Sequence, residues 1–193
     1  IESICRSAWG AKPVRGDLVP HKVQRLTVHH SARALRDNRD APARLRAHQS
    51  YHQSLGWPDI AYHFLIDRHG NIYKGRPSWA RGDTSTDYDP SGHLLVLCEG
   101  NFSEQSITKA QVRALVRVLA WASKRFGVSP RKIRGHRDFA STACPGTDLY
   151  RLIDSGNIER RVRRRLRGGR TTKKTLCGRA GRRRVAAIER GDA

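Results

Sequence analysis

The sequence has 193 residues and a formal net charge of +21 at pH 7. This length suits one domain with a substantial core and is too short for two full domains. Hydrophobic residues make up 37% of the chain, and no apolar run approaches the ~20 residues that a membrane-spanning helix needs, so we expect a soluble chain.

The positive charge is concentrated at the carboxyl end. Residues 156–193 contain 14 Lys and Arg against 3 Asp and Glu, whereas residues 1–155 contain 24 against 14. The net charge is therefore +11 for residues 156–193 and +10 for residues 1–155, although residues 156–193 are only a fifth of the chain. We divide the chain into a domain over 1–155 and an Arg-rich basic tail over 156–193, and such tails favour polyanionic partners.

The first predicted strand ends in two histidines. Residues 1–20 read as an irregular lead-in, and the apolar pattern of residues 23–28 predicts a strand. His29 and His30 follow at its carboxyl end, which is where ligand sites gather in open α/β sheets. We therefore expect one of the two histidines to belong to a site.

A helix is predicted next, because Asp40 and Pro42 form a typical helix start and Gly56 ends the pattern. His48 and His52 lie four residues apart, on one face of this helix. That spacing is compatible with a metal site, but no third ligand is nearby. A metal site at this pair of histidines is therefore not favoured.

The middle of the chain predicts a hairpin, a loop and a buried strand. Residues 61–67 and 72–74 alternate around a turn at 69–71. Residues 77–92 form a long polar loop, and loops of this length in a compact domain are often functional. The apolar run 94–98 predicts a central strand.

The clearest helix is predicted over residues 108–126. Thr108 and Gln111 form a capping box, apolar residues follow at helical spacing, and Gly127 closes the helix. Its simplest role is structural packing on the sheet. A short strand starting at Ile133 then leads into the loop that contains His136.

Two further helices are predicted before the sequence pattern fades. One follows Pro145, and a second is indicated by Ile158, Val162 and Leu166 among arginines. Beyond Gly169 no pattern forms a core, so a flexible extension is expected.

The four cysteines differ in their surroundings. Cys98 lies in an apolar run and is expected to be a small buried residue. Cys5 and Cys177 could bridge the two ends of the chain or stay reduced. Cys144 lies in a loop, eight residues after His136.

Imidazole and thiolate are the ligands that zinc prefers in proteins. His136 and Cys144 supply one of each, and His29 is the best third candidate. Three protein ligands leave a fourth position for water, which is typical of a catalytic rather than a structural zinc. Taken alone, each histidine could equally be a packed side chain.

Four segments of the chain resemble the zinc amidase family that includes the peptidoglycan recognition proteins and the amidase-type phage lysozymes. These segments are RSAWGAKP from Arg6, LTVHHSA from Leu26, DIAYHFLIDRHGNIYKGRP from Asp59 and GHRDFASTACPGTDLY from Gly135. The resemblance implies a single α/β domain with a central mixed β-sheet flanked by helices, followed here by the basic extension.

By position, the resemblance implies that His29, His136 and Cys144 bind Zn²⁺. The first histidine of the His29–His30 pair aligns with the metal ligand. Tyr62 matches a tyrosine that hydrogen-bonds the attacking water or the developing oxyanion, and Thr142 matches a residue that helps hold the tetrahedral intermediate. Donors aimed at developing charge contribute ~3 to 4 kcal/mol each.

The resemblance also implies a substrate groove across the zinc. Its candidate wall residues are His30, His52, Trp57, His63, Arg76 and Trp79. Glu99 is a weaker candidate for a general base, because some intracellular members carry a glutamate two positions earlier, where this chain has Leu97.

The implied reaction is hydrolysis of the amide bond between the lactyl group of N-acetylmuramic acid and L-alanine in peptidoglycan. The alternative is a module that binds peptidoglycan without cutting it, as in members that lack the cysteine or the tyrosine. The expected partners are muramyl peptides and, through the tail, anionic cell-wall polymers or a membrane surface. Nucleic acid is a less favoured partner of the tail.

The implied location is secreted or in the cell envelope, and a phage lysin is a further possibility. The chain begins with Ile rather than Met, as expected of a processed or trimmed chain from which any export signal has been removed. A monomer is expected.

Overall fold

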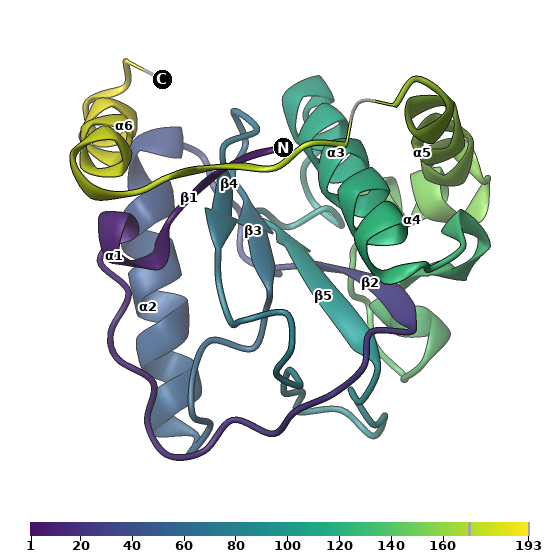
Figure 1. The fold of residues 1–193 in the computed structure, drawn as a ribbon, viewed down its shortest axis with the longest axis horizontal. Helices are drawn as coiled ribbons and strands as arrows, with labels where there is room; N and C mark the ends of the chain where they lie inside the picture. The colour runs from purple at the N-terminus through teal and green to yellow at the C-terminus, as the bar shows by residue number, and fades with distance from the viewer. Residues whose placement is uncertain (170, 193) are drawn as a thin grey trace.

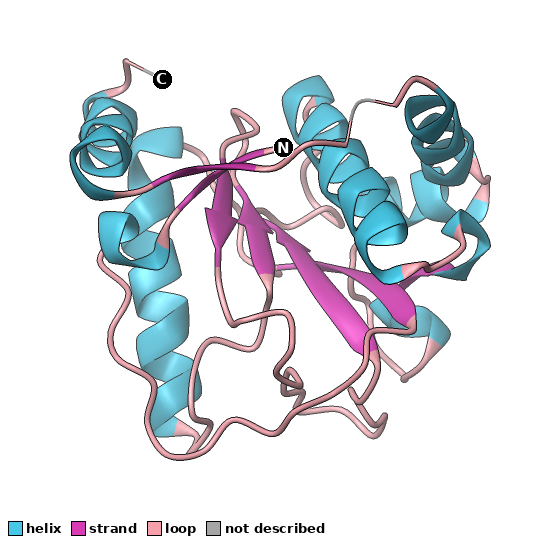
Figure 2. Cartoon of the chain, in the orientation of Figure 1, coloured by secondary structure: helices cyan, strands magenta, loops and turns pink. Residues whose placement is uncertain are grey.

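The computed structural model describes residues 1–169 and 171–192 and shows three layers, with a central sheet between two groups of helices (Figures 1 and 2). The strands are β1 (Glu2–Ile4), β2 (Arg25–His30), β3 (Phe64–Ile66), β4 (Ile72–Lys74), β5 (His93–Cys98), β6 (Ile133–Gly135) and β7 (Lys174–Leu176). The α-helices are α1 (Arg6–Trp9), α2 (Ala41–Ser54), α3 (Lys109–Phe126), α4 (Thr147–Asp154), α5 (Asn157–Arg167) and α6 (Gly178–Arg190). Short 3-10 helices are η1 (Asn38–Asp40), η2 (Pro130–Lys132) and η3 (His136–Asp138). Among the described residues, no helix combines the length and the apolar character needed to cross a membrane.

The sheet is mixed, with strand order β6-β2-β5-β3-β4-β1-β7. β3 and β4 form the predicted antiparallel hairpin, and the other neighbouring strands run parallel. The α/β class and the central mixed sheet are therefore confirmed. The pairing of β2 with both β5 and β6 places the carboxyl ends of three parallel strands side by side, at the edge where sites form.

Alternation along the strands divides the interior into two cores. Leu26 and Val28 of β2 pack in the core with α3, α4 and α5, whereas Leu97 of β5 packs in the core with α1, α2 and α6. His29 pairs with Leu97 in register. Because successive side chains point to opposite faces, His29 faces the α2 side and His30 the α3 side.

The predicted helices are present, and α3 has the expected ends. The Thr108 hydroxyl accepts from the Gln111 N–H, the Gln111 side chain accepts from the Thr108 N–H, and Gly127 adopts a left-handed conformation at φ 67°. This capping satisfies backbone groups that a helix end leaves unpaired. α3 thus has well-defined ends, and it shares one core with α4 and α5.

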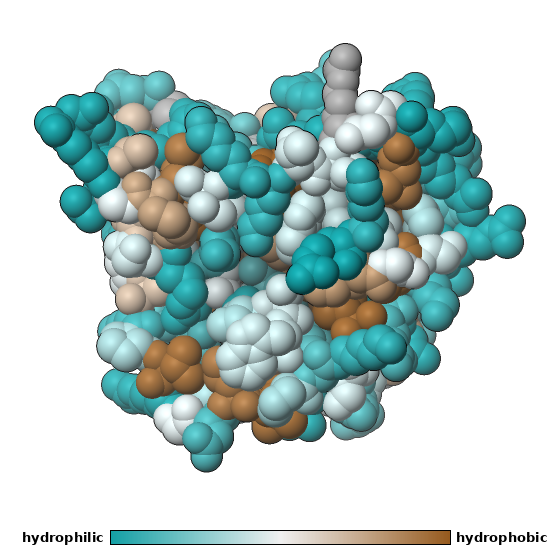
Figure 3. All heavy atoms as spheres, viewed as in Figure 1, coloured by the Kyte–Doolittle hydropathy of each residue, from teal (hydrophilic) through white to brown (hydrophobic). Residues whose placement is uncertain are grey.

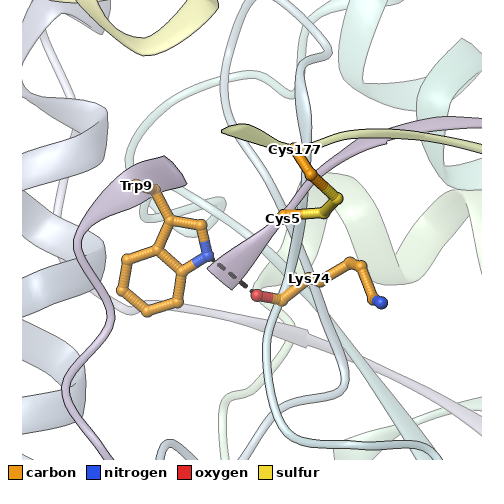
Figure 4. The surroundings of a disulfide bond; sticks show 4 residues. All are labelled: Cys5, Trp9, Lys74 and Cys177. Atoms are coloured by element: carbon orange, nitrogen blue, oxygen red, sulfur yellow. Dashed lines mark hydrogen bonds between the residues drawn. A yellow bond between two sulfur atoms is a disulfide. The ribbon is translucent and has the colours of Figure 1, made fainter. Parts of the chain in front are cut away.

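The amino-terminal segment differs from the expected irregular lead-in, because residues 2–9 form β1 and α1. Trp9 of α1 is fully buried, and its indole N–H donates to the Lys74 carbonyl at 2.8 Å (Figure 4). Each element is only three or four residues long, too short for a periodic pattern to reveal it.

The carboxyl-terminal segment also differs from the expected flexible extension. β7 pairs with β1, with Glu2 opposite Lys174, and α6 packs beside α1 and α2 (Figure 1). Val185 and Ile188 of α6 are buried. The sequence signal is weak because these two apolar residues lie among arginines and their packing surface comes from the opposite end of the chain.

A disulfide between Cys5 and Cys177 joins the two ends (Figure 4). It follows β1 and precedes α6, so it fixes the same contact that β7 makes with β1. Cys98 is buried and free, as expected.

Candidate metal centre and substrate cleft

Three predicted ligands from distant parts of the chain converge. His29 lies near the end of β2, His136 opens η3 directly after β6, and Cys144 lies in the loop before α4. One ligand atom from each lies within 4.8 Å of the others. The Cys144 Sγ is 3.6 Å from the His29 Nδ1, and the two imidazole centroids are 4.6 Å apart.

The chemistry of this donor set fits zinc. The Nε2 of His29 is buried and has no hydrogen-bond partner among the described residues. Burial lowers the pKa of His29 well below its usual value, as does the nearby His136, and burial lowers the pKa of His136 to about 4. Both imidazoles are therefore neutral at pH 7 and offer lone pairs, as a zinc ligand must.

Burial of the Cys144 thiol disfavours its ionised form. Burial raises the pKa of Cys144 to about 12, although the His30 N–H and Arg137 act in the opposite direction. That N–H donates to the Cys144 Sγ at 3.4 Å. A coordinating metal removes the thiol proton outright.

The loop that carries Cys144 is fixed by its backbone. The Arg137 N–H donates to the Cys144 carbonyl at 3.0 Å, and the Cys144 N–H donates to the Thr142 hydroxyl oxygen at 3.2 Å. Gly146 has φ 86°, and a Cβ there would lie 2.6 Å from the carbonyl carbon of Phe102. A glycine is required at this position because the backbone of the loop passes so close to its neighbour.

A hydroxyl from the long polar loop contacts the second histidine. The Thr86 Oγ1 lies 2.8 Å from the His136 Nε2. The Thr84 hydroxyl accepts from the Thr86 N–H at 3.1 Å and so holds Thr86 in place. Such outer contacts orient a ligating ring.

A cleft of about 260 Å³ opens beside the three ligands. Its lining residues are His29, Ser31, His48, Tyr51, His52, Trp57, Ala61, Tyr62, Asp83, Thr84, Ser85, Thr86, Leu97 and His136. The Tyr62 ring bridges the metal ligands and the cleft, because its centroid is 5.3 Å from that of His29 and 5.7 Å from that of His52.

Two of the predicted groove residues lie in this cleft. The rings of His52 and Trp57 contact each other at 4.8 Å between centroids. The His52 Nδ1 accepts from the Ala61 N–H at 3.1 Å, and burial lowers the pKa of His52 to about 4. His52 is therefore neutral at pH 7 with its proton on Nε2. Thr142 is half-buried beside Cys144 and is not part of the cleft lining.

Four other predicted groove residues lie outside the cleft lining. His30 faces the α3 side, where its Nδ1 accepts from the Phe102 N–H at 3.2 Å. His63 is buried between the Leu95 N–H and the Ala80 carbonyl, each at 2.8 Å. Both imidazoles thus connect segments of backbone.

Arg76 and Trp79 are the other two. The Arg76 guanidinium is buried, donates to the carbonyls of Ile60 and Asp59, and pairs with Asp83 at 2.5 Å. It reaches the cleft only through Asp83. Trp79 is 54% exposed on the outer surface.

The cleft also contains residues that were not predicted to line it: Ser31, His48, Tyr51, Asp83, Thr84, Ser85 and Thr86. Four of them come from the long polar loop, whose length was the available signal. The His48 Nε2 is 2.9 Å from the carboxylate of the buried Glu99. The same carboxylate is 3.6 Å from the Arg44 Nε. Glu99 itself is fully buried and does not line the cleft.

Known proteins share this fold and these segments. Residues 19–147 match the family model described as N-acetylmuramoyl-L-alanine amidase. The chain is 34% identical to mouse peptidoglycan recognition protein 1, covering 78% of this chain and 85% of that protein. It is 31% identical to a pig N-acetylmuramoyl-L-alanine amidase, covering 84% of this chain and 29% of that protein.

A solved structure agrees with these matches. Peptidoglycan recognition protein LE, in complex with tracheal cytotoxin, a monomeric diaminopimelic acid-type peptidoglycan, superposes with a TM-score of 0.71 at 28% identity. The superposition covers 79% of this chain and 92% of that one. Together these matches indicate a function related to peptidoglycan. Because the family model covers most of the chain, the chain belongs to the N-acetylmuramoyl-L-alanine amidase family.

Proposed function

We propose that this protein is a zinc-dependent N-acetylmuramoyl-L-alanine amidase. It hydrolyses the amide bond between the lactyl group of N-acetylmuramic acid and the first L-alanine of the peptide stem. The observation that supports this most strongly is the convergence of His29, His136 and Cys144 at a cleft that also contains Tyr62. The relatives named as amidase and as peptidoglycan recognition proteins support the substrate.

Zinc held by these three residues supplies a Lewis acid and lowers the pKa of water to roughly 7. The chain's own residues have separate tasks. Tyr62 lies beside His29, and burial raises its pKa above the usual value, so its phenol stays protonated and donates a hydrogen bond to the developing oxyanion. The Thr142 hydroxyl oxygen accepts a hydrogen bond from the Cys144 N–H, so the hydroxyl hydrogen of Thr142 stays free to donate.

The cleft lining suits a muramyl peptide, which combines hydroxyl and amide groups with short apolar side chains. Hydroxyls of Ser31, Thr84 and Ser85 offer donors and acceptors on one side, while Tyr51 and Trp57 offer ring faces on the other. The complex of a related protein with a monomeric peptidoglycan supports binding of this ligand class.

A peptidoglycan-binding module without activity is the second candidate, because several relatives are named as recognition proteins. The candidates differ in one respect. A binding module needs no complete ligand set, whereas all three ligands, Tyr62 and Thr142 are present in this chain.

The experiment is digestion of cell-wall sacculi by the zinc-loaded protein, followed by mass spectrometry of the soluble products. We expect free stem peptides that begin with L-alanine, and we expect chelation to stop their release. Cys144→Ser should abolish release, whereas Ser141→Ala, an exposed change in the same loop, should not. Binding to sacculi without release would establish the binding module instead.

A secreted or envelope location accords with this function. The Cys5–Cys177 disulfide supports it independently, because such bonds persist in oxidising compartments and are rare in the cytosol.

A further inference from the structure

A second cavity lies on the other side of the sheet, between α3 and α5. Its volume is about 570 Å³. The lining residues are Arg113, Val116, Arg117, Arg161, Arg164, Arg165 and Gly168. Five guanidinium groups from two helices thus surround one hollow, which we call the arginine cavity.

The arrangement follows from how α5 packs. Ile158 and Val162 are buried in the core that contains α3. With these two residues facing inward, positions 161, 164 and 165 on the adjoining face of α5 line the same cavity as Arg113 and Arg117 of α3. The spacing of apolar residues that packs α5 against α3 therefore also places the arginines of the two helices close together.

These charges lack directly paired carboxylates among the described residues, and only the more distant Glu2 partly offsets the charge of Arg117. Within residues 1–169 and 171–192, none of the five arginines forms an ion pair. On the same helix, Arg163 does pair with Glu159 at 2.8 Å, but it does not line the cavity. The arginine cavity is consequently a concentrated positive site.

Two of the guanidinium groups are partly removed from water. The Nε atoms of Arg117 and Arg165 are buried and have no hydrogen-bond partner among the described residues. Burial lowers the pKa of Arg117, and so do the like charges of Arg165 and Arg113. An anion in the cavity would offset this repulsion and accept the unused hydrogen bonds.

We propose that the arginine cavity binds the phosphate groups of a polyol-phosphate polymer of the cell envelope. Planar guanidinium groups bind phosphate oxygens in pairs, and several such groups in one hollow suit a ligand with repeated phosphates. The choice of a wall polymer rests on the proposed function, since an amidase acts beside such polymers.

A nucleic acid is less suited to this cavity. Sites for single-stranded nucleic acids combine positive charge with aromatic side chains on which the bases stack. The lining has no aromatic residue, and the surface over α5, at the upper right, is mostly hydrophilic (Figure 3). A phosphate polymer without bases needs no aromatic residues for stacking, so the lining suits it.

The test compares two triple variants that remove equal charge from the full-length protein. R113Q/R161Q/R164Q changes the cavity, whereas R179Q/R182Q/R183Q changes exposed arginines of α6. Titration calorimetry measures binding to poly(glycerol phosphate) and to single-stranded DNA with the same number of phosphates, over a range of salt concentrations.

We expect the cavity variant to bind poly(glycerol phosphate) at least about tenfold more weakly and to lose about two units of slope against log salt, since each phosphate contact contributes about 0.7 to 0.9. The α6 variant should change less than about twofold. Equal weakening by both variants, or no binding by the wild type, would refute the proposal. So would tighter, cavity-dependent binding of DNA, which would assign the site to nucleic acid.

Hydrolysis of a soluble muramyl peptide is measured in parallel and separates this proposal from the amidase function. Both variants should match the wild-type rate, because the arginine cavity and the zinc ligands use different residues. A wild type that binds the polymer but never cleaves would refute the amidase function alone.

Discussion

At the scale of single residues, the alternation of β2 decides which histidine faces the other two proposed zinc ligands. His29 faces the α2 side with Leu97, while His30 faces Phe102 and binds its backbone N–H. The resemblance favoured His29 from the sequence, and the strand geometry gives the physical reason. No local spacing linked His29 to the His136–Cys144 loop, because β2 and β6 come together only in the folded chain.

Tyr62→Phe tests the proposed oxyanion donor. Because the ring and its contacts with His29 and His52 are kept, zinc affinity and folding should be unchanged. The loss of the hydroxyl should lower kcat about 10²- to 10³-fold. Steady-state kinetics on a soluble muramyl peptide, with zinc affinity measured by competition, checks this. An unchanged kcat would remove Tyr62 from the mechanism.

Thr86→Val tests the contact with the second ligand. Removal of a hydroxyl 2.8 Å from the His136 Nε2 should weaken zinc binding about 10- to 100-fold, as is usual for outer partners of metal ligands. Ser85→Ala, in the same loop and also in the cleft lining, is the matched control. Equal zinc affinity in Thr86→Val and wild type would mean that this contact does not orient the ring.

Thr86 shows what residue types alone do not reveal. The polar loop was predicted to be functional from its length, but nothing in its composition distinguishes Thr86 from Thr84 or Ser85. Conversely, His63 and Arg76 looked like groove residues in the sequence. Their polar groups are used to satisfy buried backbone atoms instead, which a sequence cannot show.

At the scale of elements, the helices and strands with a local sequence pattern were predicted. The elements that depend on contacts with distant segments were not. α3 has a capping box, a periodic apolar face and a closing glycine. β1, β7 and α6 lack such marks, since each is stable only against the others. The disulfide lies within this group and explains how the two ends are held.

The joint variant Cys5→Ser/Cys177→Ser should lower the free energy of unfolding by about 2 to 5 kcal/mol, because the bond closes a loop over almost the whole chain. Urea unfolding of the variant and of the wild type measures the difference. An unchanged midpoint would mean that β7 and α6 are held without the bond.

Removal of residues 177–193 tests whether α6 belongs to the core. Loss of the helix uncovers apolar surface around Trp9 and removes the burial of Val185 and Ile188, each worth about 1.5 to 3 kcal/mol. We expect a lower melting temperature than in the disulfide variant. Equal melting temperatures would show that α6 adds nothing beyond the disulfide.

At the scale of the whole molecule, buried neutral histidines predict a pH dependence of stability. Burial lowers the pKa of His52 and His93 to about 4 and that of His63 to about 3. Between these values and the unfolded pKa of about 6.5, the unfolded chain binds more protons than the folded one. Stability is therefore fully present above about pH 6.5 and is lost as the pH falls toward 4.

Each such histidine contributes about 1.4 kcal/mol per pH unit within that window. Thermal unfolding of the chelator-treated protein at constant ionic strength should show a melting temperature that falls steadily from pH 6.5 to 4. A melting temperature that is constant or rises over this range would contradict the neutral, buried state of these side chains.

The central claim is that two imidazoles and one thiolate hold zinc and leave a fourth position to water. X-ray absorption at the zinc edge of the loaded protein tests it most directly. The account predicts one sulfur at about 2.3 Å and three light atoms at about 2.0 to 2.1 Å, with the sulfur absent in Cys144→Ser. A wild-type spectrum without sulfur, or with two sulfur ligands, would contradict it.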